Sequence, residues 1–355
     1  MNTIQLIRDL SNACGASGYE DDVVKIVRKY AGGLCVSCDA MLNTLLRFDA
    51  KDEGKPSLML DAHLDEVAFM VQAIEGNGLL KVLPLGGWVV ENVAAQIFTV
   101  QTKHEYIKGI VASKPPHFMT QSEREKKLSF EDLKLDVGAT SRDEVINDYK
   151  IRVGNPVIPY VNFEVNEKNG TMLGKAFDNR LGCAAVLKTL EHFQDEAGNL
   201  PVELVGALAS QEEVGTRGAE ITTRKVKPKL AIVFEGSPSD DFFTDEFNSQ
   251  GALGKGVQIR IKDNSYISHY GFLDFAVRTA EQEKIPYQLA VRSGGSTNAG
   301  VIHRVTEAVP VLVLGIPVRY AHTHYCYAKL SDFQNTVNLA IAIIKNINSF
   351  IADLP

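Results

Sequence analysis

The amino-acid sequence predicts an α/β fold, in which a mostly parallel β-sheet is flanked by helices and carries a small inserted β-barrel-like domain. After residue 162, segments with helical periodicity alternate with short apolar strands, which is typical of a parallel sheet covered on both faces. From about residue 72 to 161, short β-rich runs are broken by glycine, proline and charged residues, as in a small domain of hairpins. We therefore predict a discontinuous α/β domain over residues 1–69 and 162–355 and an inserted β domain over residues 70–161.

The individual elements follow from the spacing of apolar residues along the chain. Val23, Ile26, Val27 and Tyr30 have the spacing of one helix face, and residues 58–63 form a short apolar run typical of a buried strand. The charged stretch 122–127 is predicted to be a solvated loop. The same patterns predict further strands at 96–101, 107–112, 202–209, 230–234 and 309–314, and further helices at 182–193, 268–282 and 331–351.

Composition and charge exclude several classes of protein. The chain is 45% hydrophobic and 23% charged, which are ordinary globular values and exclude wholesale disorder. Its net charge is −7, so we expect neither nucleic acid nor an anionic membrane surface as a partner. No apolar run approaches the ~20 residues that span a bilayer, and the N-terminus lacks the pattern of a signal peptide. We therefore expect a cytoplasmic protein, and its five scattered cysteines argue against a disulfide framework.

Acidic residues and histidines gather where the predicted strands end. In open α/β sheets, ligands bind beyond the carboxyl ends of the strands, so these side chains are expected to share one crevice. Several carboxylates in one crevice would repel each other unless cations neutralised them. Imidazoles and carboxylates around a pair of divalent ions would solve that problem. The residues concerned are His63, Asp178, Glu212, Glu213, Glu235 and His322.

Each of these residues also has a simpler interpretation when taken alone. A single histidine after a strand is more often a hydrogen-bonded structural group, and Asp178 could be a helix N-cap. Glu212 and Glu213 could be a solvated pair, and Glu235 a turn residue. Only the joint pattern favours a metal site.

Three neighbouring residues leave alternatives open. Asp65 lies two positions after His63 and could hold its imidazole in one tautomer, as a carboxylate often does for a metal-bound histidine, or it could simply cap the strand end. His324 rivals His322, because spacing alone does not choose between them. Cys326 is also near, but thiolate ligation is the less favoured interpretation.

Four segments carry a resemblance to a known family. In order along the chain they are residues 63–70, 174–182, 211–219 and 319–323. Together they resemble the tetrahedral, glutamyl and deblocking aminopeptidases of metallopeptidase family 42. The likeness runs from about residue 5 to 345, and it implies a zinc-exopeptidase-like fold and the removal of N-terminal residues from short peptides. It also selects His322 over His324.

The resemblance implies a role for each site residue. Asp178 would bridge two divalent ions, Zn²⁺ foremost and Co²⁺ or Mn²⁺ as alternatives. One ion would be completed by His63 and Glu235, and the other by Glu213 and His322. Glu212 would be the general base for the attack of water, and Asp65 would orient His63.

The resemblance further implies self-association. The inserted β domain would make dimer contacts, and six dimers would form a hollow dodecamer that admits short unfolded peptides. The chain departs from the family pattern at Glu235 and Asn298, where Asp is usual, and at Thr323 and Cys326, where Ser and Glu are common. These departures bear on substrate and metal preference, and the preferred N-terminal residue is not predicted.

Rival functions remain open at this point. The same scaffold could serve a two-metal carboxypeptidase or an N-acyl amino acid deacylase. A glycosidase would need only two carboxylates and no metal. A non-catalytic peptide-binding relative is the third alternative, and the intact Glu212 argues against it.

Overall fold

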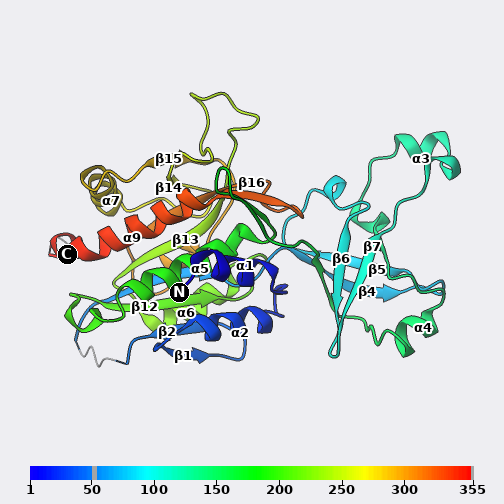
Figure 1. Cartoon of the computed structure of the whole chain (residues 1–355), viewed down its shortest axis with the longest axis horizontal. Helices are drawn as coiled ribbons and strands as arrows, with labels where there is room; N and C mark the ends of the chain where they lie inside the picture. The colour runs from blue at the N-terminus through cyan, green and yellow to red at the C-terminus, as the bar shows by residue number, and fades with distance from the viewer. Residues whose placement is uncertain (50–53, 353–355) are drawn as a thin grey trace.

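We analysed a computed structural model of the chain, which describes residues 1–49 and 54–352. Figure 1 shows two bodies that lie side by side along the longest axis: a β-sheet packed with helices, and a smaller β body. The predicted fold class, an α/β sheet with an inserted barrel, is confirmed.

The larger body is built on a mixed sheet with eleven strands among the described residues. Its centre contains β12 (Glu203–Ala209), β3 (Ser57–His63), β13 (Leu230–Pro238) and β16 (Val311–Arg319), which are parallel to one another. The strands toward the two ends are added antiparallel. They are β1 (Cys35–Cys38) and β2 (Thr44–Arg47) at one end, and β17 (Cys326–Lys329), β11 (Thr171–Gly174) and β10 (Glu164–Asn166) at the other. A branch leaves β16 through the antiparallel strand β14 (Val257–Lys262), which in turn pairs parallel with β15 (Tyr287–Val291).

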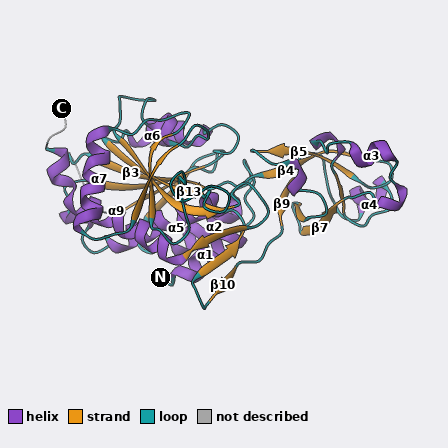
Figure 2. Ribbon diagram, turned by 90° about the horizontal axis from the view of Figure 1, so that it is seen from above, coloured by secondary structure: helices purple, strands orange, loops and turns teal. Residues whose placement is uncertain are grey.

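Helices cover both faces of this sheet (Figure 2). Alternate residues of β3 pack into two different cores because successive side chains of a strand point to opposite faces. Leu58 and Leu60 belong to the larger core and Met59 to the smaller one. The larger core contains α1 (Thr3–Asn12), α2 (Asp21–Tyr30), α5 (Phe177–His192), α7 (Tyr270–Gln282) and α9 (Leu330–Ile351), and the smaller one α6 (Arg217–Val226) and α8 (Ala299–Ile302). None of the helices in the described ranges has both the length and the apolar character needed to cross a membrane.

The strand that carries Glu235 is longer than the sequence pattern predicts. The apolar run suggested that the strand ends at residue 234, but β13 continues to Pro238. It does so because its pairing with β16 continues past Glu235, which is opposite Gly315, to Pro238 opposite Val318. Glu235 therefore lies within a strand and is not a turn residue.

The smaller body is a closed barrel with its own apolar core. The core contains Phe69, Phe98 and Val157, and the rings of Phe69 and Trp88 stack at 5.1 Å. The charged stretch 122–127 is largely a short helix and not a loop, because Thr120 and Glu123 form a reciprocal capping box. The barrel order is β4 (Ala68–Ile74), β5 (Leu80–Leu85), β8 (Lys134–Asp136), β7 (Tyr106–Val111), β6 (Ile97–Gln101) and β9 (Pro156–Pro159), with α3 (Gln121–Glu125) and α4 (Arg142–Asn147) in the connections. The domain boundaries at 69/70 and 161/162 stay a prediction.

Candidate active site

A cavity of about 380 Å³ opens near the carboxyl ends of the central strands. It collects side chains from the ends of β3, β12, β13 and β16 and from the start of α5. Asp65 does not line it but lies directly behind His63, fully buried. The predicted site residues that line the cavity are His63, Asp178, Glu212, Glu213, Glu235 and His322.

His63 is the last residue of β3 and is held between two carboxylates. Its Nδ1 lies 3.2 Å from the backbone oxygen of Asp65 and 3.4 Å from Asp65 Oδ1. Its Nε2 faces the cavity, 3.0 Å from Asp178 Oδ1. Burial by itself lowers the pKa of His63, but the carboxylates, first among them Glu212, raise it well above its ordinary value.

Asp65 also anchors the loop that carries the two adjacent glutamates. Its Oδ1 accepts a hydrogen bond from the backbone N–H of Glu212 at 2.9 Å, and its Oδ2 accepts one from that of Glu213 at 3.1 Å. The Ser17 hydroxyl donates to Oδ2 at 2.6 Å. Burial opposes ionisation of Asp65, yet its hydrogen bonds, notably that from His63, lower its pKa overall. One buried carboxylate thus lies against the imidazole of His63, as predicted for Asp65, and also binds the backbone of both glutamates, which the sequence pattern did not reveal.

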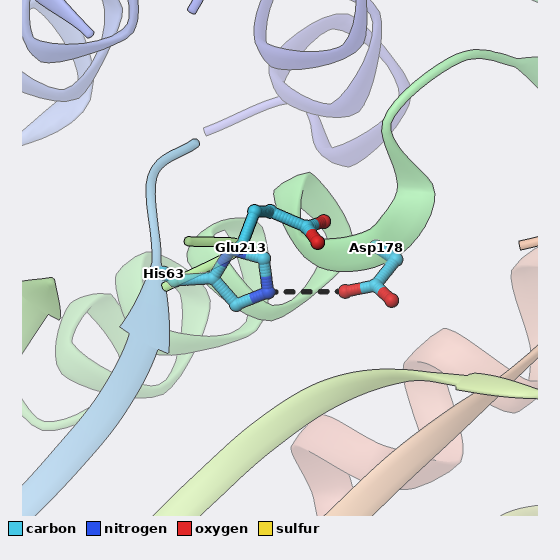
Figure 3. Close-up of side chains that lie close together, drawn as sticks. All are labelled: His63, Asp178 and Glu213. Atoms are coloured by element: carbon cyan, nitrogen blue, oxygen red, sulfur yellow. Dashed lines mark hydrogen bonds and ion pairs between the residues drawn. The ribbon is translucent and has the colours of Figure 1, made fainter. Parts of the chain in front are cut away.

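Asp178 lies between the two histidines of the cavity. Its Oδ1 is 3.0 Å from His63 Nε2, and its Oδ2 is 3.4 Å from His322 Nε2. Figure 3 shows Asp178 and His63 pointing toward one another, with Glu213 beside them. Burial raises the pKa of Asp178, but hydrogen bonds from the imidazoles, His322 first, bring it far below its ordinary value.

The N-cap interpretation of Asp178 is wrong. Asn179 makes the capping bond instead, because its Oδ1 accepts from the backbone N–H of Gly182 at 3.0 Å. The same Oδ1 accepts from the backbone N–H of Gly236 on β13 at 3.2 Å. Its side-chain amide donates to the Phe234 carbonyl at 2.9 Å. The start of α5 is therefore tied to β13 by Asn179, which leaves the Asp178 carboxylate free to face the cavity.

His322 is positioned by the barrel as well as by its own loop. Its Nδ1 hydrogen-bonds the carbonyl of Gly87, a barrel residue, at 2.9 Å. Its Nε2 faces Asp178 and lies 3.8 Å from Glu213 Oε2. Burial lowers the pKa of His322, but Glu213 and Asp178 raise it to about 10.

The remaining carboxylates of the cavity are buried close together. Burial raises the pKa of Glu212 well above its ordinary value, against the effect of His63. Burial raises the pKa of Glu213 to about 8, and burial together with the charge of Asp178 raises that of Glu235 to about 7. Without cations, the protein could not keep all of these groups ionised in one cavity.

The donor set fits divalent metal ions. One ligand atom each of His63, Asp178 and Glu213 lie within 4.8 Å of one another. Glu213 Oε1 and Glu235 Oε1 are buried, and among the described residues neither has a hydrogen-bond partner. Buried carboxylate oxygens without partners are costly, and coordination to a cation would satisfy them. Imidazole nitrogens with carboxylate oxygens suit Zn²⁺, Co²⁺ and Mn²⁺.

Sequence reasoning missed two arginines that line the same cavity. Arg260 lies on β14 and is 3% exposed, and Arg292 follows β15. Arg260 reaches Ser237 Oγ at 2.8 Å and Asp263 Oδ2 at 3.3 Å. In the sequence, apolar Val257 and Ile259 alternate with polar side chains, which indicates a strand with one polar face. That pattern does not show that the polar face borders the cavity.

Comparisons with known proteins agree with this geometry. Residues 44–339 match the family model described as M42 glutamyl aminopeptidase. The glutamyl aminopeptidase of Lactococcus lactis subsp. cremoris is 31% identical over 353 residues, which cover 98% of this chain and 98% of the relative.

Solved structures show the same fold over almost the whole chain. A TET aminopeptidase from the marine sediment archaeon Thaumarchaeota archaeon SCGC AB-539-E09 superposes with a TM-score of 0.91 at 33% identity, covering 97% of each chain. The TET1 peptidase of Pyrococcus horikoshii, which can assemble into a tetrahedron or a large octahedral shell, superposes with a TM-score of 0.86 at 24% identity, covering 97% of this chain and 99% of that one.

The family match covers more than half of the chain, and its relatives are peptide-bond hydrolases that use divalent metal ions. This supports metallo-aminopeptidase activity. The chain belongs to the M42 glutamyl aminopeptidase family.

Proposed function

We propose that this protein removes the N-terminal residue of short peptides with the help of two divalent metal ions. The observation that carries the proposal is the position of Asp178, whose two carboxylate oxygens face two different imidazoles. Glu235 is 3.5 Å from His63, and Glu213 is 3.8 Å from His322, so each imidazole has its own carboxylate partner.

These distances support one division of the ligands. Asp178 would bridge the ions, His63 and Glu235 would hold one, and His322 and Glu213 the other. When bound, paired divalent ions make water a stronger nucleophile at neutral pH and polarise the peptide carbonyl.

Glu212 is the residue that we assign to proton transfer. Its backbone is fixed by Asp65, and its side chain lines the cavity 3.9 Å from His63 Nε2. Glu212 would take a proton from the attacking water and return it to the departing amine.

The adjacent glutamates provide a matched test of these roles. Replacing Glu212 with Gln should lower kcat by roughly 10²–10⁴-fold while the metal content per chain stays at the wild-type value. Replacing Glu213 with Gln should lower the metal content as well. Activity on an aminoacyl anilide and metal content by mass spectrometry give the two readouts. Equal loss of metal in both variants would show that Glu212 is a ligand and overturn its assignment as the base.

The free amine of the substrate separates this proposal from related reactions. An aminopeptidase acts on an unblocked aminoacyl anilide, whereas a deacylase requires the N-acylated compound and a carboxypeptidase requires a free carboxyl end. Activity only on N-acetylated substrates would contradict the proposal. Absence of hydrolysis with bound peptide would instead favour the non-catalytic alternative.

The two arginines of the cavity support a preference for acidic N-terminal residues. Nε of Arg260 and Nε of Arg292 are buried, and within the described residues neither has a hydrogen-bond partner. Burial, followed by the charge of Arg260, lowers the pKa of Arg292 to about 10. A carboxylate from a substrate would satisfy these cations. The name of the L. lactis relative, glutamyl aminopeptidase, agrees with this preference.

Replacement of Arg292 with Gln tests this preference. A lost hydrogen bond to a charged group corresponds to about a 10- to 100-fold fall in kcat/KM, which we expect for glutamyl anilide and not for leucyl anilide. Arg304→Gln removes an exposed arginine outside the cavity and is the control. An equal fall for both substrates would contradict an acidic preference.

The barrel supports the proposed dimer contact. Ile97 and Ile110 are opposite each other on β6 and β7 and are 42% and 53% exposed. A contact with a second chain would remove this apolar pair from water. We propose that this domain pairs two chains and that the dimers assemble further into a closed shell, as the P. horikoshii TET1 peptidase can.

A further inference from the structure

A loop on the α/β body exposes three phenylalanines. It comprises residues 239–250, between β13 and β14, and we call it the phenylalanine loop. Phe242, Phe243 and Phe247 are 65%, 77% and 96% exposed. In Figure 1 the connection between β13 and β14 projects above the sheet as a yellow-green loop.

The three exposed rings offer a sizeable apolar area on one short loop. An aromatic side chain can bury about 150–250 Å², so these three offer roughly 400 Å², about half of what one partner contributes to a standard interface. The surface continues onto the body of the protein, because Phe242 lies edge-on to Tyr320 at 5.7 Å and Tyr320 lies 6.3 Å from Tyr327. Exposed apolar patches of this size mark interaction sites.

The phenylalanine loop is held in a defined shape by its own acidic residues. Asp240 closes its base by accepting hydrogen bonds from Ser249 Oγ at 2.7 Å and from the backbone N–H of Gln250 at 2.9 Å. Asp241 forms a bidentate ion pair with Arg319 on β16. Its Oδ1 accepts a hydrogen bond from Arg319 Nε at 3.0 Å, and its Oδ2 accepts one from Arg319 Nη2 at 2.6 Å. The rings are therefore presented by an ordered loop, which reduces the entropy lost when a partner binds.

Symmetry points to a second copy of this chain as the partner. A contact that pairs two identical chains about a twofold axis uses the same patch on both. It therefore ends at the dimer, and neither patch is left free to bind a third chain. Assembly of dimers into a shell requires a different patch on each chain. The phenylalanine loop lies on the α/β body, apart from the barrel to which we assign the dimer contact (Figure 1).

We propose that the phenylalanine loop is the surface through which one dimer contacts the next. The proposal rests on the self-association proposed above and does not depend on the catalytic roles. Because the loop follows β13, whose Pro238 lines the active-site cavity, this contact would place a neighbouring chain close to the cavity opening.

The test compares two sets of exposed aromatic residues in the full-length protein. The variant Phe243→Ser/Phe247→Ser removes the two most exposed rings and leaves Phe242 and its contact with Tyr320 in place. Tyr270→Ser is the matched control, because Tyr270 is 81% exposed on α7, outside the loop. Native mass spectrometry gives the assembly size, and hydrolysis of an aminoacyl anilide gives the activity per chain.

The expected result is a shift of the double variant from a large particle to dimers, with activity on the anilide within about twofold of wild type. The control should keep the wild-type mass. An unchanged mass in the double variant would overturn the proposal, as would equal dissociation of the control. A wild-type protein that is itself no larger than a dimer would also overturn it, whereas the anilide assay would still report on the proposed activity.

One further outcome would show that the phenylalanine loop binds the substrate and not a second copy of this chain. If the double variant keeps its mass and its anilide activity but loses activity on tetrapeptides, the loop binds the substrate chain beyond the cleaved bond, and the contact between dimers is refuted.

Discussion

His322 and His324 are two residues apart on one loop, yet they have opposite environments. His322 is half-buried, its Nε2 faces Asp178, and neighbouring carboxylates raise its pKa to about 10. His324 is 1% exposed, packs edge-on against Phe98 at 4.4 Å, and its pKa falls to about 4 because of burial. The residue type does not decide the role of an imidazole. Its surroundings decide which nitrogen is available.

Both imidazoles are hydrogen-bonded to backbone carbonyls of the barrel, but through different nitrogens. His322 uses Nδ1 to reach Gly87, which leaves Nε2 available to the cavity. His324 uses Nε2 to reach the Ile97 carbonyl at 2.8 Å, and its Nδ1 is buried without a hydrogen-bond partner in the described part of the chain. The inserted barrel therefore helps to build the active site, because it orients one imidazole and anchors the loop through the other.

The largest effect is expected from replacing His322 with Ala. Loss of a proposed ligand should lower metal content by about one ion per chain and kcat/KM by at least about 10³-fold. Metal analysis and the anilide assay measure both. Full metal content in this variant would show that His322 is not a metal ligand and would contradict the distinction between the two histidines.

A smaller effect is expected from replacing His324 with Phe, which keeps the ring in the aromatic cluster but removes the donor to Ile97. The Ile97 carbonyl keeps the hydrogen bond from the backbone N–H of Tyr160 at 3.1 Å, so one hydrogen bond is lost, at a cost of about 0.5–1.5 kcal/mol. For a chain of this size that loss lowers Tm by about 1–2 °C. Metal content should stay near the wild-type value, while kcat falls modestly because the loop of His322 is less firmly held. His104→Phe, at an exposed barrel position, is the control. Metal loss equal to that of the His322 variant would make His324 the ligand.

The last effect is on stability alone and concerns Glu20, which is fully buried like His324 but carries a carboxyl group. Burial, followed by the charge of Asp65, raises the pKa of Glu20 from 4.5 to about 7. Between these values the folded protein keeps a proton that the unfolded chain releases, so the free energy of unfolding decreases as pH rises from 4.5 to 7.

Replacing Glu20 with Gln should remove this dependence. The Gln variant and the wild type should have similar Tm at pH ~4.5, and at pH ~8 the Gln variant should be more stable, by on the order of 1–3 kcal/mol. Thermal unfolding at the two pH values measures the difference. A wild-type protein that is the more stable one at the higher pH would show that Glu20 is ionised and paired.

The apolar periodicity was sufficient to predict most of the architecture. The runs at 58–63, 202–209 and 309–314 contain strands because a buried parallel strand needs apolar residues on both faces. A continuous apolar run of that kind is visible within a few residues of sequence. The length of β13 was not predictable in the same way, because it depends on pairing with β16, far away in the chain.

The candidate site was predicted as a set of residues, and its geometry was not. That His63 and Glu235 follow or end apolar runs was visible in the sequence, and the ends of parallel strands share one edge. The contact between His63 and Asp178 joins positions 115 residues apart, and only the fold makes it. The same holds for the arginines that line the cavity.

The sequence by itself thus determined which side chains are available at the edge of the sheet, because the apolar runs beside them are local patterns. The tertiary structure decided which nitrogen of each histidine is free, that Asn179 and not Asp178 caps the helix, and that Asp65 fixes both glutamates. These choices depend on hydrogen bonds between distant segments and on burial. Both arise only when the chain has folded.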